Sequence, residues 1–443
     1  MSILIKNVTI VTMNHNRQIL HGSVYIEGDE IKEVGDAAHQ ANKVIDGAGQ
    51  VLIPGLIQPH IHLCQTLFRG QADDLELLDW LRLRVWPLEG AHDPESIYYS
   101  ALLGCGEMFL GGTTSIIDME TVHHTDSAIQ AIADCGMRAI TGKVMMDHGE
   151  ALPDSLREGT GPSIQESVDL LEKWHGRYNG RIQYAFMPRF VVTCSEELLA
   201  EVAKLAGQYN VKVHTHASEN RSEIQLVGRE RGMRNVAYLH KLDMTGPNLI
   251  LAHCIWLDDT EISILAQTGT AMVHCPSSNM KLASGIARIA EIVEMGITVG
   301  IAADGATCNN NLDQFQEMRL CALLQKPLHG PTVMPAQKVF ELATIGGAKA
   351  MGLDKQIGSI EPGKRADLAL VALDGLHNTP SQGGNIYSQL VYQLQSSDVA
   401  MTMVDGQVVM EKRQLLTIDQ KEVRKKCLKA ITRLKQRTGV ILS

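Results

Sequence analysis

Four short apolar runs in the middle of the chain each lead to a histidine or an aspartate. The runs have the length and the aliphatic composition of buried strands. The polar residues that follow them are His60 and His62, His216, His253 and Asp304. In a (β/α)8 barrel the carboxyl ends of the parallel strands form one face, so residues in this position are expected to meet there. The pattern therefore favours a barrel with a polar site at the ends of its strands.

His60 and His62 are separated by one residue, Ile61. Because side chains alternate along a strand, the two imidazoles project to the same side and can reach one ion. The spacing alone is weak evidence, since two strand histidines are often ordinary hydrogen-bonded residues. Together with the later histidines and the aspartate, it predicts a site for a divalent ion such as zinc or iron, which binds imidazole nitrogen and carboxylate oxygen.

The chain has 443 residues, of which 44% are hydrophobic, and can bury one large core and a smaller second one. Residues 1–54 and 356–443 contain strand-like runs separated by turns such as Gly28 and Asp29. Between them, residues 55–355 alternate strand-like runs with helical patterns, as βα units do. We predict an α/β fold, with a (β/α)8 TIM barrel over residues 55–355. A small β-sandwich domain is built from both termini and is followed by a terminal helix.

The charge balance argues against a nucleic-acid partner. Forty basic and fifty acidic residues give a formal net charge of −10, and the basic residues of 421–437 are interpreted as one face of an amphipathic helix.

The nine cysteines contain no Cys-x-x-Cys pair, which indicates free thiols in a reducing compartment. Since the sequence has neither a signal peptide nor an apolar run of about twenty residues, we expect a cytoplasmic protein without a membrane segment.

Several motifs together resemble one known group of enzymes. They are Pro54 to Ile57 before the first histidines, His216 to Glu219, His274 to Asn279, Asp304 to Thr307, and Gly358 to Lys364. Over essentially its full length, the chain resembles the amidohydrolase superfamily, specifically its mononuclear-metal aminoheterocycle deaminases and chlorohydrolases. The resemblance implies that His60, His62, His216 and Asp304 bind one Zn²⁺ or Fe²⁺, and that His253 lies beside the metal-bound water.

The residue types fit a hydrolytic deaminase that releases ammonia from an amino-substituted N-heterocycle. A divalent ion makes a bound water acidic enough to react near neutral pH, and Asp304 is placed to take its proton and pass it to the departing ammonia. Glu219, three residues after His216, is our candidate for the general acid that protonates the ring nitrogen. His253 would orient the attacking water. We expect a small heterocyclic substrate and a homo-oligomer, a dimer or higher.

A second metal ion is not expected. Two-metal members of the superfamily bridge their ions with a carboxylated lysine at the end of the fourth strand. Here that strand runs from Arg181 to Met187 and leads into Pro188 and Arg189. Lys143, in the preceding strand, is interpreted as structural.

Two residues favour guanine or a related aminopurine as the substrate. Gln65 and Arg189 occupy the positions at which guanine deaminases of this superfamily bind the purine, and a guanidinium offers a fixed array of donors to a ring carbonyl. The long segment from Leu67 to Asp93 is predicted to be a loop that covers the site, with Trp80 as a further substrate contact.

Other substrates and other classes were weighed against guanine. The sequence around Trp80 and Glu89, and the residues after Asp304, are closer to S-adenosylhomocysteine and 5′-deoxyadenosine deaminases. The s-triazine amino- and chlorohydrolases share the same framework, so chloride is an alternative leaving group. A cytidine-type zinc deaminase is excluded because no Pro-Cys-x-x-Cys follows His148 and Glu150. A non-catalytic homologue is disfavoured because such proteins typically lose metal ligands, whereas this chain keeps them.

Overall fold

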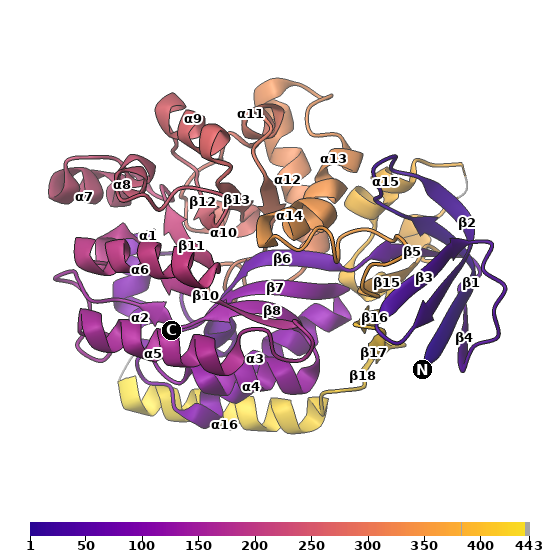
Figure 1. The fold of residues 1–443 in the computed structure, drawn as a ribbon, viewed down its shortest axis with the longest axis horizontal. Coiled ribbons are helices and arrows are strands. Elements are labelled where there is room, and N and C mark those ends of the chain that lie inside the picture. Colours follow the sequence, from indigo (N-terminus) through magenta and orange to yellow (C-terminus); the bar gives the residue numbers. More distant parts are fainter. Residues whose placement is uncertain (382, 439–443) are drawn as a thin grey trace.

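The computed structural model of the protein describes residues 1–381 and 383–438. It consists of a parallel barrel surrounded by helices and a separate mixed sheet to which both ends of the chain contribute (Figure 1). The predicted fold class, a TIM barrel with a small β domain from both termini, is confirmed.

Eight strands of the described barrel follow one another in chain order, and neighbours pair in parallel. They are β6 (Leu56–Ile61), β7 (Thr113–Met119), β8 (Arg138–Gly142), β10 (Ile182–Pro188), β11 (Lys212–Ala217), β12 (Leu249–His253), β13 (Ala271–His274) and β14 (Val299–Ile301). A short strand, β9 (Val144–Met145), also pairs with β10. Helices cover the outside and side chains fill the inside, so the strands are almost entirely buried.

The barrel closes between its first and last strands, β6 and β14. Just beyond the end of β14, the backbone N–H of Asp304 donates to the carbonyl oxygen of His60 at 3.2 Å. The two strands lie so close that a Cβ atom on Gly300 would come within 2.5 Å of the Pro59 side chain. Glycine is therefore required at position 300. This close approach brings the first and the last of the predicted site residues together.

The helices of the barrel follow its strands. The longer ones are α3 (Pro94–Leu110), α4 (Thr125–Cys135), α5 (Thr160–Trp174), α6 (Glu196–Tyr209), α7 (Arg221–Arg231), α9 (Asp259–Thr268) and α12 (Gln314–His329). The shorter ones are α8 (Asn235–Lys241), α10 (Pro276–Lys281), α11 (Ile289–Glu294), α13 (Ala336–Glu341) and α14 (Gly347–Met351). Local sequence fixes where they begin: Ser195 accepts the Leu198 N–H at the start of α6, and Asp258 and Glu261 form a capping box at α9.

The second sheet, called here the terminal sheet, combines strands from both ends of the chain. Its order is β18-β17-β16-β15-β5-β1-β2-β3, and β4 pairs with β1 beside this path. The strands are β1 (Ser2–Val11), β2 (Ile19–Glu27), β3 (Glu30–Gly35), β4 (Lys43–Asp46), β5 (Gln50–Pro54), β15 (Leu368–Ala372), β16 (Val399–Val404), β17 (Gln407–Glu411) and β18 (Gln414–Leu415). A bridge between Glu30 and Arg365 brings β3 back toward the C-terminal part. The sheet thereby encloses an apolar core of its own, which includes Ile10, Ile26, Leu52, Leu368 and Met401.

A buried arginine joins the barrel to the terminal sheet. Arg138, at the start of β8, donates to Asp367 through Nε at 2.6 Å and through the terminal nitrogen Nη2 at 3.1 Å. It also forms an ion pair with Asp405. The Arg138 side chain is 1% exposed, so water does not reach its guanidinium, and the carboxylates of Asp367 and Asp405 compensate the positive charge.

The prediction of a loop between Leu67 and Asp93 is wrong for residues 77–89. These residues, called here the covering segment, form α1 (Leu77–Trp80), a π-helical turn (Leu81–Val85) and α2 (Trp86–Glu89). The physical reason is that apolar residues recur here every three or four positions, as on the buried face of a helix, and the sequence interpretation overlooked this spacing. The residues with this spacing, which are all buried, are Leu77, Leu81, Val85 and Leu88.

The last helix, α16 (Gln420–Thr438), returns to the barrel and packs along α3. Lys426 and Arg433 on its polar side both pair with Glu95 at 2.7 Å, in agreement with the predicted amphipathic helix.

The nine cysteines, which all fall in the described ranges, are buried and unpaired. Among the described helices, none has the length and apolar character needed to cross a membrane.

Candidate active site

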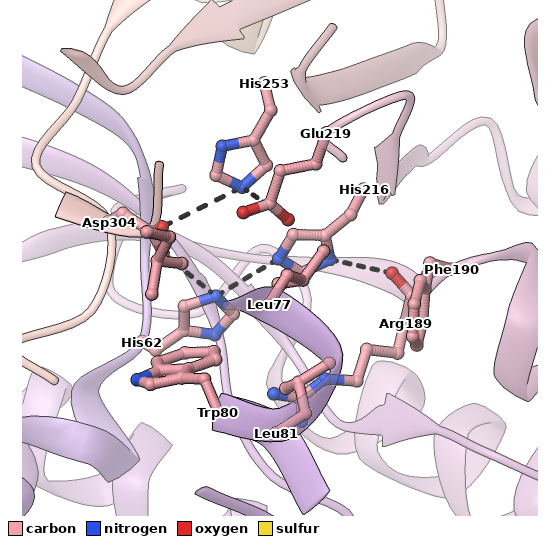
Figure 2. A pocket seen from close by; sticks show the side chains of 11 residues that line it. His62, Leu77, Trp80, Leu81, Arg189, Phe190, His216, Glu219, His253 and Asp304 are labelled. Atoms are coloured by element: carbon pink, nitrogen blue, oxygen red, sulfur yellow. Dashed lines mark hydrogen bonds and ion pairs between the residues drawn. The ribbon is translucent and has the colours of Figure 1, made fainter. Parts of the chain in front are cut away.

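The polar residues at the strand ends meet at the carboxyl face of the barrel (Figure 2). His60 lies in β6 and His62 directly after it, His216 lies in β11, and His253 is the last residue of β12. Asp304 follows β14 in a left-handed backbone conformation, with φ of +63°. All five side chains are buried.

Three imidazole nitrogens and one carboxylate oxygen converge on one point, called here the metal cluster. The Nε2 atoms of His60 and His62 each lie 3.3 Å from Asp304 Oδ1. The Nε2 atom of His62 also lies 3.3 Å from that of His216. The Nε2 atom of His60 is buried and has no hydrogen-bond partner within residues 1–381 and 383–438.

The other ring nitrogens determine where the lone pairs point. His62 Nδ1 lies 2.8 Å from the carbonyl oxygen of Met119, and His216 Nδ1 lies 2.7 Å from that of Arg189. Because a carbonyl oxygen only accepts, both Nδ1 atoms carry the proton and both Nε2 atoms present a lone pair. Two such lone pairs facing each other repel unless a cation lies between them. The geometry therefore fits a bound metal ion.

His60 is oriented by another histidine, His214. The Nδ1 atom of His60 lies 2.7 Å from Nε2 of His214, whose own Nδ1 lies 3.0 Å from the carbonyl oxygen of Ile250. His214 therefore donates to the carbonyl and accepts from His60, which leaves a lone pair on His60 Nε2. Sequence reasoning missed His214, although its position two residues before His216 places it on the same face of β11.

The metal cluster can hold one divalent ion. Neutral imidazoles and a carboxylate are the ligands of many zinc and iron sites, and the carbonyl contacts of the rings are the kind that orient such ligands. Burial lowers the pKa of His60 to about 4, so this ring is neutral near pH 7.

Glu219 and His253 lie beside the metal cluster on the side of the cavity. Glu219 Oε2 is 3.6 Å from His253 Nε2, which is 3.8 Å from Asp304 Oδ2. Burial raises the pKa of Glu219 to about 7, so its carboxyl group can hold a proton near neutral pH. The backbone N–H of Glu219 donates to the buried carboxylate of Glu223 at 2.8 Å, which fixes the turn after β11.

A cavity of about 350 Å³, partly open to solvent, lies over these groups. Arg189, Glu219 and His253 contribute to its polar wall. Trp80 belongs to its apolar wall, and the covering segment therefore lies over the site (Figure 2). The apolar wall consists of Leu77, Trp80, Leu81, Phe190 and Leu282.

Arg189 lines this cavity, but its charge is already paired. Its two terminal nitrogens donate to the carboxylate of Glu89 at 2.6 and 3.3 Å, and both side chains are buried. Gln65 is not among the lining residues. Its amide donates to Glu89 at 2.9 Å and accepts from Thr307 at 2.5 Å. The motif that contains Glu89 was noted in the sequence, but its pairing with Arg189 was not predicted.

Lys143, the lysine considered as a bridge between two metal ions, pairs with a carboxylate outside the metal cluster. Lys143 is buried and pairs with Glu158 at 2.6 Å, which agrees with the structural role expected of it. Pro188 is the last residue of the fourth barrel strand, β10, and Arg189 follows it.

Residues 51–409 match the model of the amidohydrolase family. The chain belongs to the amidohydrolase family. This match confirms the predicted superfamily and the prediction of a metal-dependent hydrolase. The amidohydrolase barrel thus carries the metal cluster at the face where enzymes with this fold place their active sites.

Several amidohydrolases are similar over nearly their whole length. A 5′-deoxyadenosine deaminase of Methanothermobacter thermautotrophicus is 41% identical over 408 residues, which cover 91% of this chain and 93% of that protein. A 5-methylthioadenosine/S-adenosylhomocysteine deaminase of Syntrophomonas wolfei is 38% identical over 429 residues, covering 96% and 97% of the two chains.

Solved amidohydrolase structures share the fold. An adenosine deaminase of Xanthomonas campestris with bound zinc superposes with a TM-score of 0.92 at 30% identity, covering 98% of each chain. A guanine deaminase of Escherichia coli superposes with a TM-score of 0.83 at 28% identity, covering 93% of this chain and 99% of that one. The zinc in the first of these supports the expected cofactor, one divalent ion.

Proposed function

We propose that this amidohydrolase removes the 6-amino group of an adenosine-type nucleoside, such as 5′-deoxyadenosine, and releases it as ammonia. The observation that carries the proposal is the placement of Glu219, a carboxyl group able to hold a proton near pH 7, in the cavity wall beside His253. Deamination of a purine needs such an acid at a ring nitrogen, because charge must not build up in the ring during attack.

The metal would be held by His60, His62, His216 and Asp304. When bound, a divalent ion acts as a Lewis acid that activates water near neutral pH. His253 would orient the attacking water through Nε2, which faces both Glu219 and Asp304.

Proton transfer then involves two carboxyl groups. Glu219 would give its proton to the ring nitrogen next to the reacting carbon. Asp304 Oδ2, which faces His253 and not the other ligands, would take the proton of the attacking water. The same oxygen would return that proton to the departing amine, so that ammonia leaves neutral and Asp304 ends ionised. As the carbon–oxygen double bond forms, the proton of the new hydroxyl group would pass to Glu219, which regains its acid form and leaves a neutral product.

Two observations support an adenosine-type ring over guanine. Relatives named for adenosine derivatives are 38–41% identical to this chain, whereas the guanine deaminase structure is 28% identical. In addition, Arg189 already donates to Glu89, and Gln65 does not line the cavity. The two residues expected to bind the carbonyl and edge of guanine are thus engaged with other protein groups, and the alternative substrate fits better.

The cavity wall supports an uncharged substituent at the 5′ position of the nucleoside. The covering segment contributes Leu77, Trp80 and Leu81, and Phe190 and Leu282 complete the apolar part. Such a wall favours a purine face and a methyl or methylthio group, because an ionised group placed against it would lose its hydration.

The test is ammonia release by the metal-loaded enzyme from a panel of substrates. The panel contains 5′-deoxyadenosine, 5′-methylthioadenosine, S-adenosylhomocysteine, guanine and atrazine. We expect kcat/KM on the first two to exceed that on guanine by about 100-fold or more, the scale at which a mismatched polar site rejects a ligand. Faster turnover of guanine would overturn the proposal, and chloride release from atrazine without nucleoside turnover would replace it.

A further inference from the structure

The short helix α10 places two neighbouring side chains against the reacting groups. The hydroxyl of Ser278 donates to Asp304 Oδ2 at 2.7 Å. Next to it, the side-chain oxygen of Asn279 lies 2.9 Å from Nδ1 of His253. Both Ser278 and Asn279 are fully buried. One helical turn therefore contacts both Asp304 and His253.

Ser278 acts on the oxygen of Asp304 that faces away from the other ligands. Oδ1 lies 3.3 Å from His60 Nε2 and His62 Nε2 and accepts from the backbone N–H of Gly305 at 2.7 Å. Oδ2 accepts from Ser278 and lies 3.8 Å from His253 Nε2. Because one lone pair of Oδ2 is occupied by the serine, the other is available on the side of His253, where a proton would be exchanged.

Asn279 determines the tautomer of His253. Its carbonyl oxygen accepts the Nδ1 proton of the ring, so in the neutral ring the lone pair lies on Nε2, which faces Glu219. His253 has a left-handed backbone, with φ of +69°, which few residues adopt without support.

The helix itself is held firmly. Pro276 occupies its first turn, and the backbone carbonyl of Asn279 accepts from Ser284 N–H at 2.9 Å. Ser277, the third residue of this turn with a polar side chain, points to a different partner and bonds Glu317 through its N–H at 3.0 Å and its hydroxyl at 2.5 Å. It contacts neither Asp304 nor His253 in any hydrogen bond of the described chain and offers a matched control.

We infer that Ser278 and Asn279 are positioning residues of the active site: Ser278 directs Oδ2 of Asp304, and Asn279 sets the tautomer of His253. The inference rests on the proposed deamination, because that reaction is what uses these two atoms. Contacts of this kind around metal sites typically change activity by about 10–100-fold when they are removed.

The test compares four single variants of the metal-loaded enzyme on its best nucleoside substrate. Asn279→Leu and Ser278→Ala are expected to lower kcat about 10–100-fold with KM changed less than about threefold and with one metal ion per chain retained. Asn279→Asp keeps an acceptor for the Nδ1 proton and should recover most of the kcat lost in Asn279→Leu. Ser277→Ala should keep kcat near the wild-type value.

A second readout does not depend on turnover. In ¹⁵N-histidine spectra of the metal-loaded protein, with His253 assigned by its substitution, the ring should be protonated at Nδ1 in wild type and Asn279→Asp. In Asn279→Leu this preference should be lost. Equal kcat losses in the Leu and Asp variants, an equal loss in Ser277→Ala, or an unchanged spectrum in Asn279→Leu would overturn the inference. If the wild type turned over no nucleoside, the proposed function would fail, whereas the spectra would still decide the tautomer.

Discussion

Each histidine of the metal cluster has one nitrogen fixed by the protein and one directed to the centre. Three carbonyl groups, those of Met119, Arg189 and Ile250, impose this arrangement directly or through His214. The ligand positions could be predicted from the sequence because each follows a strand-like run. The carbonyl contacts of His62 and His216 could not, because any residue type can supply a backbone carbonyl. The contact of His60 is a side chain, His214, whose position on the same face of β11 as His216 could have been read from the sequence.

Replacing a metal ligand and replacing the residue that orients it should weaken metal binding to different extents. His60→Ala removes a ligand and should abolish stoichiometric zinc after dialysis. His214→Ala leaves the ligands in place but removes the acceptor for His60 Nδ1, so it should weaken zinc about 10–100-fold while still binding one ion at saturation. Chelator competition measures both. Equal zinc affinity in His214→Ala and wild type would show that His60 does not need this contact.

The pH dependence of turnover should report Glu219. Its pKa is raised to about 7 by burial, so the acid form is present below pH 7 and is lost as the pH rises above it. A reaction that needs the acid form should therefore lose kcat about tenfold per unit on the alkaline side. Glu219→Gln cannot donate a proton and should lower kcat by about 100-fold or more, remove this alkaline limb and leave the metal content unchanged. If the same loss of kcat at alkaline pH persisted in the variant, a group other than Glu219 would be responsible for it.

At the scale of secondary structure, the barrel strands could be predicted and the covering segment could not. Runs such as 249–252 are apolar throughout because parallel strands are buried on both faces. The covering segment keeps a helical apolar period, but it contains Pro87, a residue that usually marks a helix boundary. In the structure Pro87 lies in the first turn of α2, where a helix tolerates it. The structure of the segment is stabilised by packing over the site, a tertiary effect that local sequence does not reveal.

Trp80 should contribute to substrate binding more than to chemistry. Trp80→Ala removes an aromatic ring from the cavity wall, and loss of a base–aromatic contact is worth about 1–3 kcal/mol. We expect KM for 5′-deoxyadenosine to rise about tenfold or more with a much smaller change in kcat. Leu83→Ala, on the exposed side of the same segment, is the control and should change neither. A fall in kcat alone for Trp80→Ala would contradict the assignment.

At the scale of the whole molecule, the barrel and the terminal sheet are joined by the buried ion pairs of Arg138. Arg138→Met leaves Asp367 and Asp405 without their cation and should destabilise the protein by about 3–5 kcal/mol. Arg82→Met removes an exposed pair with Asp79 and should cost no more than about 1 kcal/mol. Urea unfolding followed by circular dichroism compares the two. Equal midpoints for both variants would mean that the buried pairs do not stabilise this junction.

The pairing of β5 with β15 has a consequence for synthesis of the chain. The N-terminal strands leave the ribosome first, yet β5 finds its antiparallel neighbour only after more than three hundred further residues have been translated. Until then its open edge and the apolar side chains of the terminal sheet are exposed to other nascent chains, a condition that favours aggregation. The terminal sheet can thus be completed only after all the barrel strands have been translated.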